Sequence, residues 1–338
     1  MTRTNRRPSR RNWLTAISLV LALAGMGISS AIAADAIEFN AGIADPVNTV
    51  LAMWVAEDAG LYAQNGLNVH IVNMNGGSHG AEELQAGRLD VMHVGLSSVV
   101  KINRAGGDLR FIGSLSNVIR FTFFSAPLVK TAADLKGGLV GVSTIGSESD
   151  STVTLALQRL GLSRNDVKIA EFGGGARRLA AVKSGEIRAT ALNEPFTSLA
   201  REQGINILID LVPEQIPWLF SGITTERSVI QKRRDSLLRF LKATVEGNYL
   251  ALSNETMAKQ TLAKELKISD PKILDISYND FKQQSPLNLE PSPQAAKNIL
   301  AQFPGGSVSV EDYVDTSLLD ELKRDGFFQE MENKYGKP

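Results

Sequence analysis

Two segments place serine hydroxyls where a helix is expected to begin, and such positions can bind a ligand. Ser97 and Ser98 follow an expected strand and open a helix, where free backbone N–H groups and the helix dipole favour an anion or a carbonyl oxygen. Residues 146–151, Gly-Ser-Glu-Ser-Asp-Ser, form a glycine-led turn whose backbone N–H groups can approach a ligand closely. A purely structural cap is the alternative at Ser97 and Ser98. The chemistry indicated is noncovalent binding.

Carboxylates in the same regions oppose a bare anion as the ligand. Glu148 and Asp150 lie in the glycine-led turn, and Glu194 follows another expected strand. A carboxylate in a cleft needs a partner, which a protonated amine or a pyrimidine-like donor would supply. A salt bridge from a neighbouring arginine is the alternative for Glu194. Asp45, directly before Pro46, fits a helix N-cap with proline at the first helical position, and it also fits a ligand contact.

Composition excludes several classes of protein. The chain has no cysteine and only three histidines, so it lacks disulfides, cysteine nucleophiles and the ligand spacing of a metal site. A serine hydrolase would need Gly-x-Ser-x-Gly, which Gly146-Ser147-Glu148 does not supply. We therefore expect no catalytic residue, no cofactor and no metal. The 36 basic and 36 acidic residues give no basic excess for binding nucleic acid.

The first 33 residues read as a signal peptide. Five arginines precede an uncharged apolar run of about 16 residues, Trp13 to Ile28, and a small-x-small sequence ends at Ala33. A membrane anchor is the alternative, but the run is shorter than the roughly 20 residues of a spanning helix. Residues 9–14, Ser-Arg-Arg-Asn-Trp-Leu, also resemble a twin-arginine export signal. We expect cleavage after Ala33, a periplasmic mature chain and a mature net charge of −5.

The rest of the chain alternates short β-rich runs with helical patterns as far as about residue 224. Such alternation predicts crossover units and a mainly parallel sheet. Beyond residue 225 the strand signals stop and amphipathic helices follow. The expected strands include 37–42, 68–72, 91–94, 110–116, 139–142, 167–170, 189–192 and 206–209. The expected helices include 47–64, 81–86, 98–104, 151–160, 177–184, 196–203, 229–252, 256–266, 271–283, 293–302 and 316–335.

An internal repeat indicates two similar halves. Residues 76–91 and 174–189 each contain a Gly-Gly turn, one short helix, a glycine stop and a strand, at a constant offset of 98 residues. In open α/β sheets, ligands bind beyond the carboxyl ends of the strands. The loops after residues 94 and 192 should therefore face one shared cleft.

A series of short motifs resembles the periplasmic binding proteins of the nitrate, sulfonate and taurine ABC importers, which include the thiamine-pyrimidine-precursor relatives. Each motif is weak alone, but their joint order along residues 37–210 is specific. The motifs are AEDAGLY at 56–62, GLNV at 66–69, GG at 76–77, AGRLDV at 86–91, ADLKG at 133–137, GVS at 141–143, GS at 146–147, GL at 161–162, GEI at 185–187 and EP at 194–195.

The resemblance implies an α/β chain with the type II periplasmic-binding-protein fold, two Rossmann-like lobes joined by a two-strand hinge. The first lobe would comprise residues 34–123 and a mostly helical return segment, 225–338, and the second lobe residues 124–224. The hinge strands would lie near 121–125 and 220–224.

The resemblance also implies where a ligand would lie: against the loop after the first strand, at two helix N-termini and near the Glu-Pro loop. The matching positions here are Asp45, Asn48, Gly77, Ser97, Ser98, Ser147, Glu148, Ser149, Glu194 and Phe196.

The function expected from the resemblance is capture of a small molecule by the solute-binding component of an ABC importer. An organic nitrogen or aromatic compound ranks first as the ligand, a sulfonate second and nitrate third. The partners would be the permease and its ATPase, with the binding protein itself a monomer. A sensory protein that presents its ligand to a membrane receptor is the alternative. An enzyme is not expected, because the catalytic relatives depend on a Cys-rich segment.

Overall fold

The computed structural model describes residues 36–306 and 309–337. The predicted signal peptide therefore lies outside the described residues. Two five-stranded mixed sheets, which we call the first and the second sheet, organise the described chain. None of the helices within 36–306 and 309–337 is long and apolar enough to span a membrane.

The first sheet has the order β2-β1-β3-β10-β4. β1 pairs in parallel with β2 and β3, whereas β10 runs antiparallel to both of its neighbours. The strand bounds are β1 Ile37–Ile43, β2 Leu67–Asn73, β3 Val91–Val94, β4 Leu109–Val118 and β10 Pro217–Glu226.

The second sheet repeats this plan in the order β7-β6-β8-β5-β9, again with one antiparallel strand, β5, in the fourth position. The predicted repeat is visible in it, because α3 (Gly77–Gln85) and α6 (Gly175–Ser184) begin 98 residues apart. The strand bounds are β5 Thr122–Ser125, β6 Leu139–Val142, β7 Lys168–Glu171, β8 Ala189–Leu192 and β9 Asn206–Asp210.

The chain passes between the sheets twice, at 119–121 and at 211–216. The two passages are hydrogen-bonded to each other: Ile119 N–H donates to the Ile216 carbonyl at 3.0 Å, and Leu211 N–H donates to the Phe121 carbonyl at 3.3 Å. The expected hinge ranges lie slightly too late in the chain. Residues 122–125 are already β5 of the second sheet, and 220–224 are held between β3 and β4 in the first sheet.

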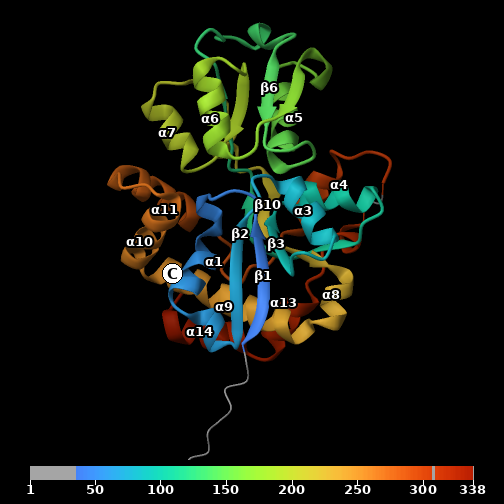
Figure 1. Cartoon of the computed structure of the whole chain (residues 1–338), viewed down its shortest axis with the longest axis vertical. Helices are drawn as coiled ribbons and strands as arrows, with labels where there is room; N and C mark the ends of the chain where they lie inside the picture. The colour runs from blue at the N-terminus through green and yellow to red at the C-terminus, as the bar shows by residue number, and fades with distance from the viewer. Residues whose placement is uncertain (1–35, 307–308, 338) are drawn as a thin grey trace, which may run out of the picture. The chain divides into compact units, whose positions relative to one another are not determined.

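Helices cover each sheet separately. α5 (Glu148–Arg159), α6 and α7 (Phe196–Glu202) surround the second sheet, and Figure 1 shows them gathered about β6. α3 and α4 (Leu96–Arg104) pack against β3 and β4 of the first sheet.

The predicted helix 47–64 is interrupted. A 3-10 turn at Asn48–Val50 leads into α1 (Leu51–Asp58), and α2 (Leu61–Gln64) starts after Gly60. Gly60 has a φ of 67°, a left-handed conformation that favours glycine and ends the first helix. Gly326, with a φ of 78°, divides the predicted helix 316–335 in the same way.

The segment after Glu226 returns to the first sheet as helices, as predicted. α9 packs on α1, α12 on β10, and α13 on β4, so late segments lie beside early ones in Figure 1. The helices are α8 Arg227–Lys232, α9 Arg234–Ser253, α10 Glu255–Leu266, α11 Pro271–Gln284, α12 Pro293–Leu300, α13 Ser317–Arg324 and α14 Phe327–Tyr335.

Aromatic packing joins this return segment to the first sheet. Phe240 of α9 lies between Phe39 of β1 and Tyr62 of α2, with ring centroids 4.9 Å and 5.2 Å apart. All three rings are buried, and the Tyr62 hydroxyl lies 3.1 Å from Thr244 Oγ1. The stack therefore buries a large apolar area and also satisfies its one polar group.

The close approach of α9 to α1 predicts a stability effect at Gly247. A Cβ atom there would lie 2.4 Å from the Ala52 carbonyl oxygen and 2.8 Å from Ala56 Cβ. Gly247→Ala should therefore lower the free energy of unfolding by about 1–3 kcal/mol, measured by urea denaturation. Gly113→Ala is the control, because its added Cβ meets nothing closer than 3.7 Å. Equal effects of the two substitutions would contradict the predicted overpacking.

Candidate functional site

A cavity lies where the carboxyl ends of the strands of the two sheets meet. It contains about 520 Å³ of space free of protein atoms, part of it open to solvent. Most of its polar lining comes from the loops after β1, β6 and β8, as expected for an α/β ligand site, and β3, α6 and β10 add His93, Arg178 and Ser221. The lining residues are Ala44, Asp45, Val47, Thr49, Gly77, His93, Val94, Gly95, Phe121, Ser143, Ser147, Glu148, Ser149, Arg178, Asn193, Phe220 and Ser221.

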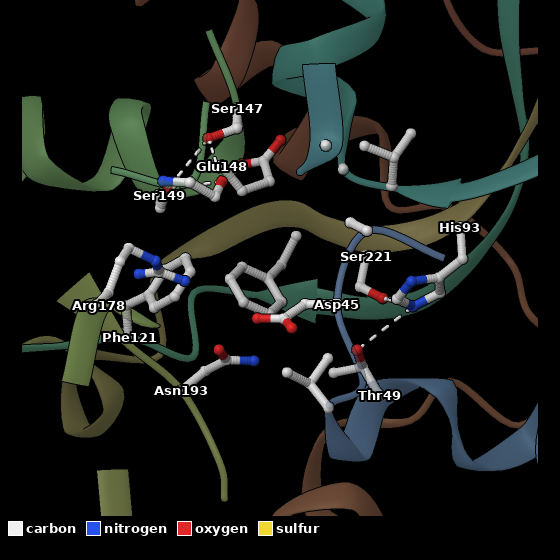
Figure 2. A pocket seen from close by; sticks show the side chains of 17 residues that line it. Asp45, Thr49, His93, Phe121, Ser147, Glu148, Ser149, Arg178, Asn193 and Ser221 are labelled. Carbon is white, nitrogen blue, oxygen red and sulfur yellow. Dashed lines mark hydrogen bonds between the residues drawn. The ribbon is translucent and has the colours of Figure 1, made fainter. Parts of the chain in front are cut away.

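Five of the ten predicted site residues line this cavity, and Figure 2 shows four of them as labelled side chains. These five are Asp45, Gly77, Ser147, Glu148 and Ser149. The structure places Asn48, Ser97, Ser98, Glu194 and Phe196 outside the lining.

Glu148 joins the two sheets through a charged hydrogen-bonding site. Its carboxylate accepts the Ser97 backbone N–H, at the start of α4, and the Trp218 indole N–H of β10, each at 2.6 Å. Burial raises the pKa of Glu148 to about 7, although both hydrogen bonds act to lower it. The N-terminus of α4 was predicted to bind an anion, and it contacts the protein's own carboxylate.

Asp45 makes the reciprocal contact from the first sheet. It accepts the Gly175 backbone N–H at the start of α6. Burial raises the pKa of Asp45, while the charge of Arg178 and the Gly175 N–H lower it. The predicted helix-capping role was wrong: Asp45 lies before a 3-10 turn whose N-cap position is Val47, and it caps a helix of the other sheet instead.

Arg178 is the cation of the cavity, and sequence reasoning missed it. It is buried in α6, where its guanidinium donates to the Gly173 carbonyl at 3.0 Å and to the Ala191 carbonyl. Burial lowers the pKa of Arg178 to about 10, and Asp45 acts in the opposite direction. The available signal was its position in the repeat: Arg178 in the second copy corresponds to Gly80 in the first.

His93 lies on the opposite side of the cavity, with Thr49 and Ser221 (Figure 2). Its Nε2 is 2.6 Å from Ser221 Oγ and 3.3 Å from Thr49 Oγ1, while Nδ1 is buried without a hydrogen-bond partner among the described residues. Burial lowers the pKa of His93 to about 4, so the ring is neutral at pH 7.

Three serines form one hydroxyl cluster beside Glu148. The Ser143 hydroxyl donates to Ser147 Oγ at 2.9 Å, and Ser143 N–H donates to Ser149 Oγ at 2.8 Å. Asp150 is directed elsewhere, since it accepts the Gly146 N–H at 2.8 Å and pairs with Arg164. Of the two acidic residues in this loop, Glu148 therefore lines the cavity and Asp150 does not.

Several residues predicted to bind ligand have other partners. Asn48 donates its side-chain amide to the Ser277 carbonyl at 3.0 Å and to Asp280 at 2.7 Å. Phe196 lies in a separate groove that also contains Pro46 and Trp54. Ser98 is fully buried behind the cavity wall, and no hydrogen bond to its hydroxyl is made within the described residues.

Glu194 lies in a second surface hollow, beside Arg120 and Arg201. Its carboxylate accepts the Ser198 backbone N–H at 3.2 Å, in the first turn of α7. Burial raises the pKa of Glu194. The charges of Arg201 and Arg120 lower this pKa, but by less than burial raises it. The partner of Glu194 in the structure is therefore a helix N-terminus, in place of the arginine salt bridge that was the alternative to a ligand contact.

Other lining residues carried no sequence signal of their own. Asn193 is buried, and its side-chain amide has no hydrogen-bond partner within residues 36–306 and 309–337. Phe121 and Phe220 pack edge to face, with centroids 4.9 Å apart, and give the cavity an apolar wall. Within the described chain, no cluster of three or more His, Cys, Asp or Glu residues could hold a metal ion. The arrangement can bind a small molecule through polar groups and an aromatic edge.

The buried neutral His93 predicts a specific loss of stability in acid. Its folded pKa lies below the unfolded value of 6.5, so the stability it contributes is present above pH 6.5 and is lost as the pH falls towards 4. Between pH 7 and pH 5 the protein should lose about 2 kcal/mol more unfolding free energy than His93→Gln does. Urea denaturation at both pH values measures this difference, with exposed His79→Gln as the control. Parallel profiles for the protein and His93→Gln would show that His93 is not held neutral.

Relatives with assigned names are binding proteins. The chain is 25% identical to the riboflavin-binding protein RibY of Chloroflexus aurantiacus over 163 residues, 47% of this chain and 45% of RibY. The match thus spans less than half the length of that relative. The chain is also 23% identical to a protein of Brucella abortus that is named "putative binding protein", over 266 residues, 74% of this chain and 78% of the relative.

Solved structures of binding proteins share the fold. The alkanesulfonate-binding protein SsuA of Xanthomonas axonopodis pv. citri, bound to MOPS, has a TM-score of 0.69 at 19% identity, covering 83% of this chain and 99% of SsuA. The nitrate-binding protein NrtA of Synechocystis PCC 6803 has a TM-score of 0.70 at 15% identity, covering 86% of this chain and 89% of NrtA. The type II periplasmic-binding-protein fold predicted from the sequence is confirmed.

An enzyme shares the fold as well. The desulfurization enzyme DSZB has a TM-score of 0.61 at 16% identity, covering 86% of this chain and 99% of DSZB. The architecture alone therefore does not distinguish binding from catalysis.

A family model shows which protein family this chain belongs to. The model described as NMT1/THI5 like matches residues 48–258, more than half of the sequence and most of both sheets. This agrees with the resemblance carried by the short motifs at residues 56–195. The chain belongs to the NMT1/THI5-like family.

Proposed function

We propose that the protein is the periplasmic solute-binding component of an ABC importer. The observation that carries the proposal is one cavity whose polar walls come from the strand ends of two separate sheets. Binding proteins among the relatives and structural neighbours support it. The leader expected at residues 1–33 would take the chain to the periplasm.

In this proposal the two sheets are the cores of two lobes, and the ligand closes one lobe on the other. The limits expected from the sequence, 34–123 with 225–338 and 124–224, shift to the two passages, because β5 (122–125) belongs to the second sheet and β10 (217–226) to the first. The paired passages at 119–121 and 211–216 would bend as the lobes separate. A ligand that touches both lobes favours the closed state, which the permease and its ATPase would then recognise. No bond is made or broken in this cycle.

We infer that the ligand is a small organic nitrogen or aromatic compound, with a sulfonate as the second class. Phe121 and Phe220 provide an aromatic wall, and the free Asn193 amide can donate and accept hydrogen bonds. Glu148 and Asp45 can accept hydrogen bonds from ring or amino nitrogen atoms. SsuA, a structural neighbour named for alkanesulfonates, is the reason to retain sulfonates.

A sensory role is the other candidate, since a closed pair of lobes can be presented to a membrane receptor as well as to a permease. Neighbouring genes distinguish the two roles. Permease and ATPase genes beside this one would support import, whereas a kinase or chemoreceptor gene would support sensing.

Ligand binding can be tested with a thermal-shift screen of residues 34–338. The compounds should include amino-pyrimidines, aromatic amines, alkanesulfonates and nitrate. A ligand at 100 times its dissociation constant adds about 2.7 kcal/mol to the unfolding free energy, so a true ligand should raise Tm by several degrees. If no member of any class raises Tm, the proposed role as a solute-binding protein loses its support.

Asn193 provides the local test once a ligand is found. Asn193→Ala should weaken binding about tenfold in titration calorimetry, because it removes one buried hydrogen-bonding group from the cavity. Asn333→Ala, on the exposed face of α14, is the matched control and should leave affinity unchanged. Equal affinity of Asn193→Ala and the wild type would place the ligand elsewhere.

A further inference from the structure

Helix N-termini around the cleft attract negative charge, and the chain supplies that charge itself. Four carboxylates accept backbone N–H groups at or just before the starts of four helices. Glu148 contacts α4, Asp45 contacts α6, Glu194 contacts α7, and Asp150 accepts the N–H of Gly146 before α5. Two of these helix starts, those of α4 and α6, contact carboxylates of the cavity lining, so a free anion would have to displace Glu148 or Asp45 there.

Glu148, like Asp45, both lines the cavity and is hydrogen-bonded to the opposite sheet, and it has two donors there. It begins α5 on the second sheet, yet its two donors, Ser97 N–H and Trp218 Nε1–H, belong to elements of the first sheet. Two short charged hydrogen bonds hold it at the start of α4. The same place would suit a sulfonate or nitrate oxygen if the carboxylate were absent.

Gly95 makes this contact sterically possible. A Cβ atom on Gly95 would lie 2.2 Å from Glu148 Cγ and 2.3 Å from Glu148 Oε1. Gly95 has φ −84° and ψ 166°, which alanine adopts without strain. The absence of a side chain therefore serves the close approach of the carboxylate rather than an unusual backbone conformation.

An additional polar group at this helix start lacks a partner. Ser98 Oγ is fully buried without a hydrogen bond from any described residue, and it lies close to Gly77 of the cavity lining. Arg178 of the lining donates Nε and Nη1 to the Gly173 and Ala191 carbonyls, and the charge of Asp45 acts on it. An anion entering the closed site would thus meet the Glu148 carboxylate, while Asp45 already offsets the charge of Arg178.

We propose that Glu148 is a specificity-determining residue, whose carboxyl group fills the α4 N-terminus on closure and excludes ligands with a sulfonate or nitrate-like group there. The proposal rests on the proposed function and narrows its ligand to a neutral or cationic compound. A free anion at the α4 N-terminus competes with closure, because both require the Ser97 N–H.

The test removes the carboxylate and asks whether the site becomes an anion site. Glu148→Ala and Glu148→Ser should each bind methanesulfonate at least tenfold more tightly than the wild type in titration calorimetry. Both variants delete the carboxylate and leave the Ser97 N–H free. Glu202→Ala, an exposed change of the same charge on α7, should behave as the wild type does.

Folding of each variant is checked by circular dichroism and thermal unfolding, and Glu148→Ser serves if Glu148→Ala fails to fold. The proposal is overturned if the wild type binds methanesulfonate as tightly as the folded variants, or if neither folded variant gains affinity.

The outcome is independent of the screen for a natural ligand. A gain of methanesulfonate binding in the variants supports the exclusion by Glu148 even if no solute binds the wild type. Methanesulfonate binding by the wild type supports a binding function and overturns the exclusion.

Discussion

The arrangement of the two sheets depends on hydrogen bonds across the cleft, in which a carboxylate of one sheet accepts a backbone N–H from a helix N-terminus of the other. Removing Glu148 and Asp45 from water is costly, as their raised pKa values show. Backbone N–H groups at Ser97 and Gly175 offset that cost only while the sheets are close together. The two contacts are reciprocal, because each sheet contributes one carboxylate and one helix start. Closure thus depends on directional bonds, in addition to apolar contact.

Local patterns in the sequence were sufficient for most of the architecture. Strands 91–94, 139–142 and 189–192 have the predicted limits, because short β-rich runs bounded by glycine and helix signals leave little choice of end. The constant offset between the glycine turns at 76 and 174 corresponds to the common strand order of the two sheets. Helix limits were less accurate where a glycine such as Gly60 takes a left-handed conformation, which a hydrophobic pattern does not encode.

The cavity was harder to predict, since its lining depends on pairings between distant segments. Asp45 and Glu148 were identified as site residues from their loops, but their partners lie 130 and 51 residues away. Arg178 looked like one more charge on an amphipathic helix, and burial against Gly173 and Ala191 distinguishes it. Ser98 and Glu194 follow the correct strands, but Gly95 and Asn193 of these loops line the cavity, and Ser98 and Glu194 lie behind the wall or in another hollow.

The strand β10 connects the joint between the sheets to the binding chamber. It starts directly after the passage at 211–216 and carries Trp218, Phe220 and Ser221 towards Glu148, the aromatic wall and His93. A twist of that passage would therefore move Trp218, Phe220 and Ser221 together. In the proposed cycle, opening would therefore also release the solute, because the solute would lose its stacking surface and its polar contacts in a single motion.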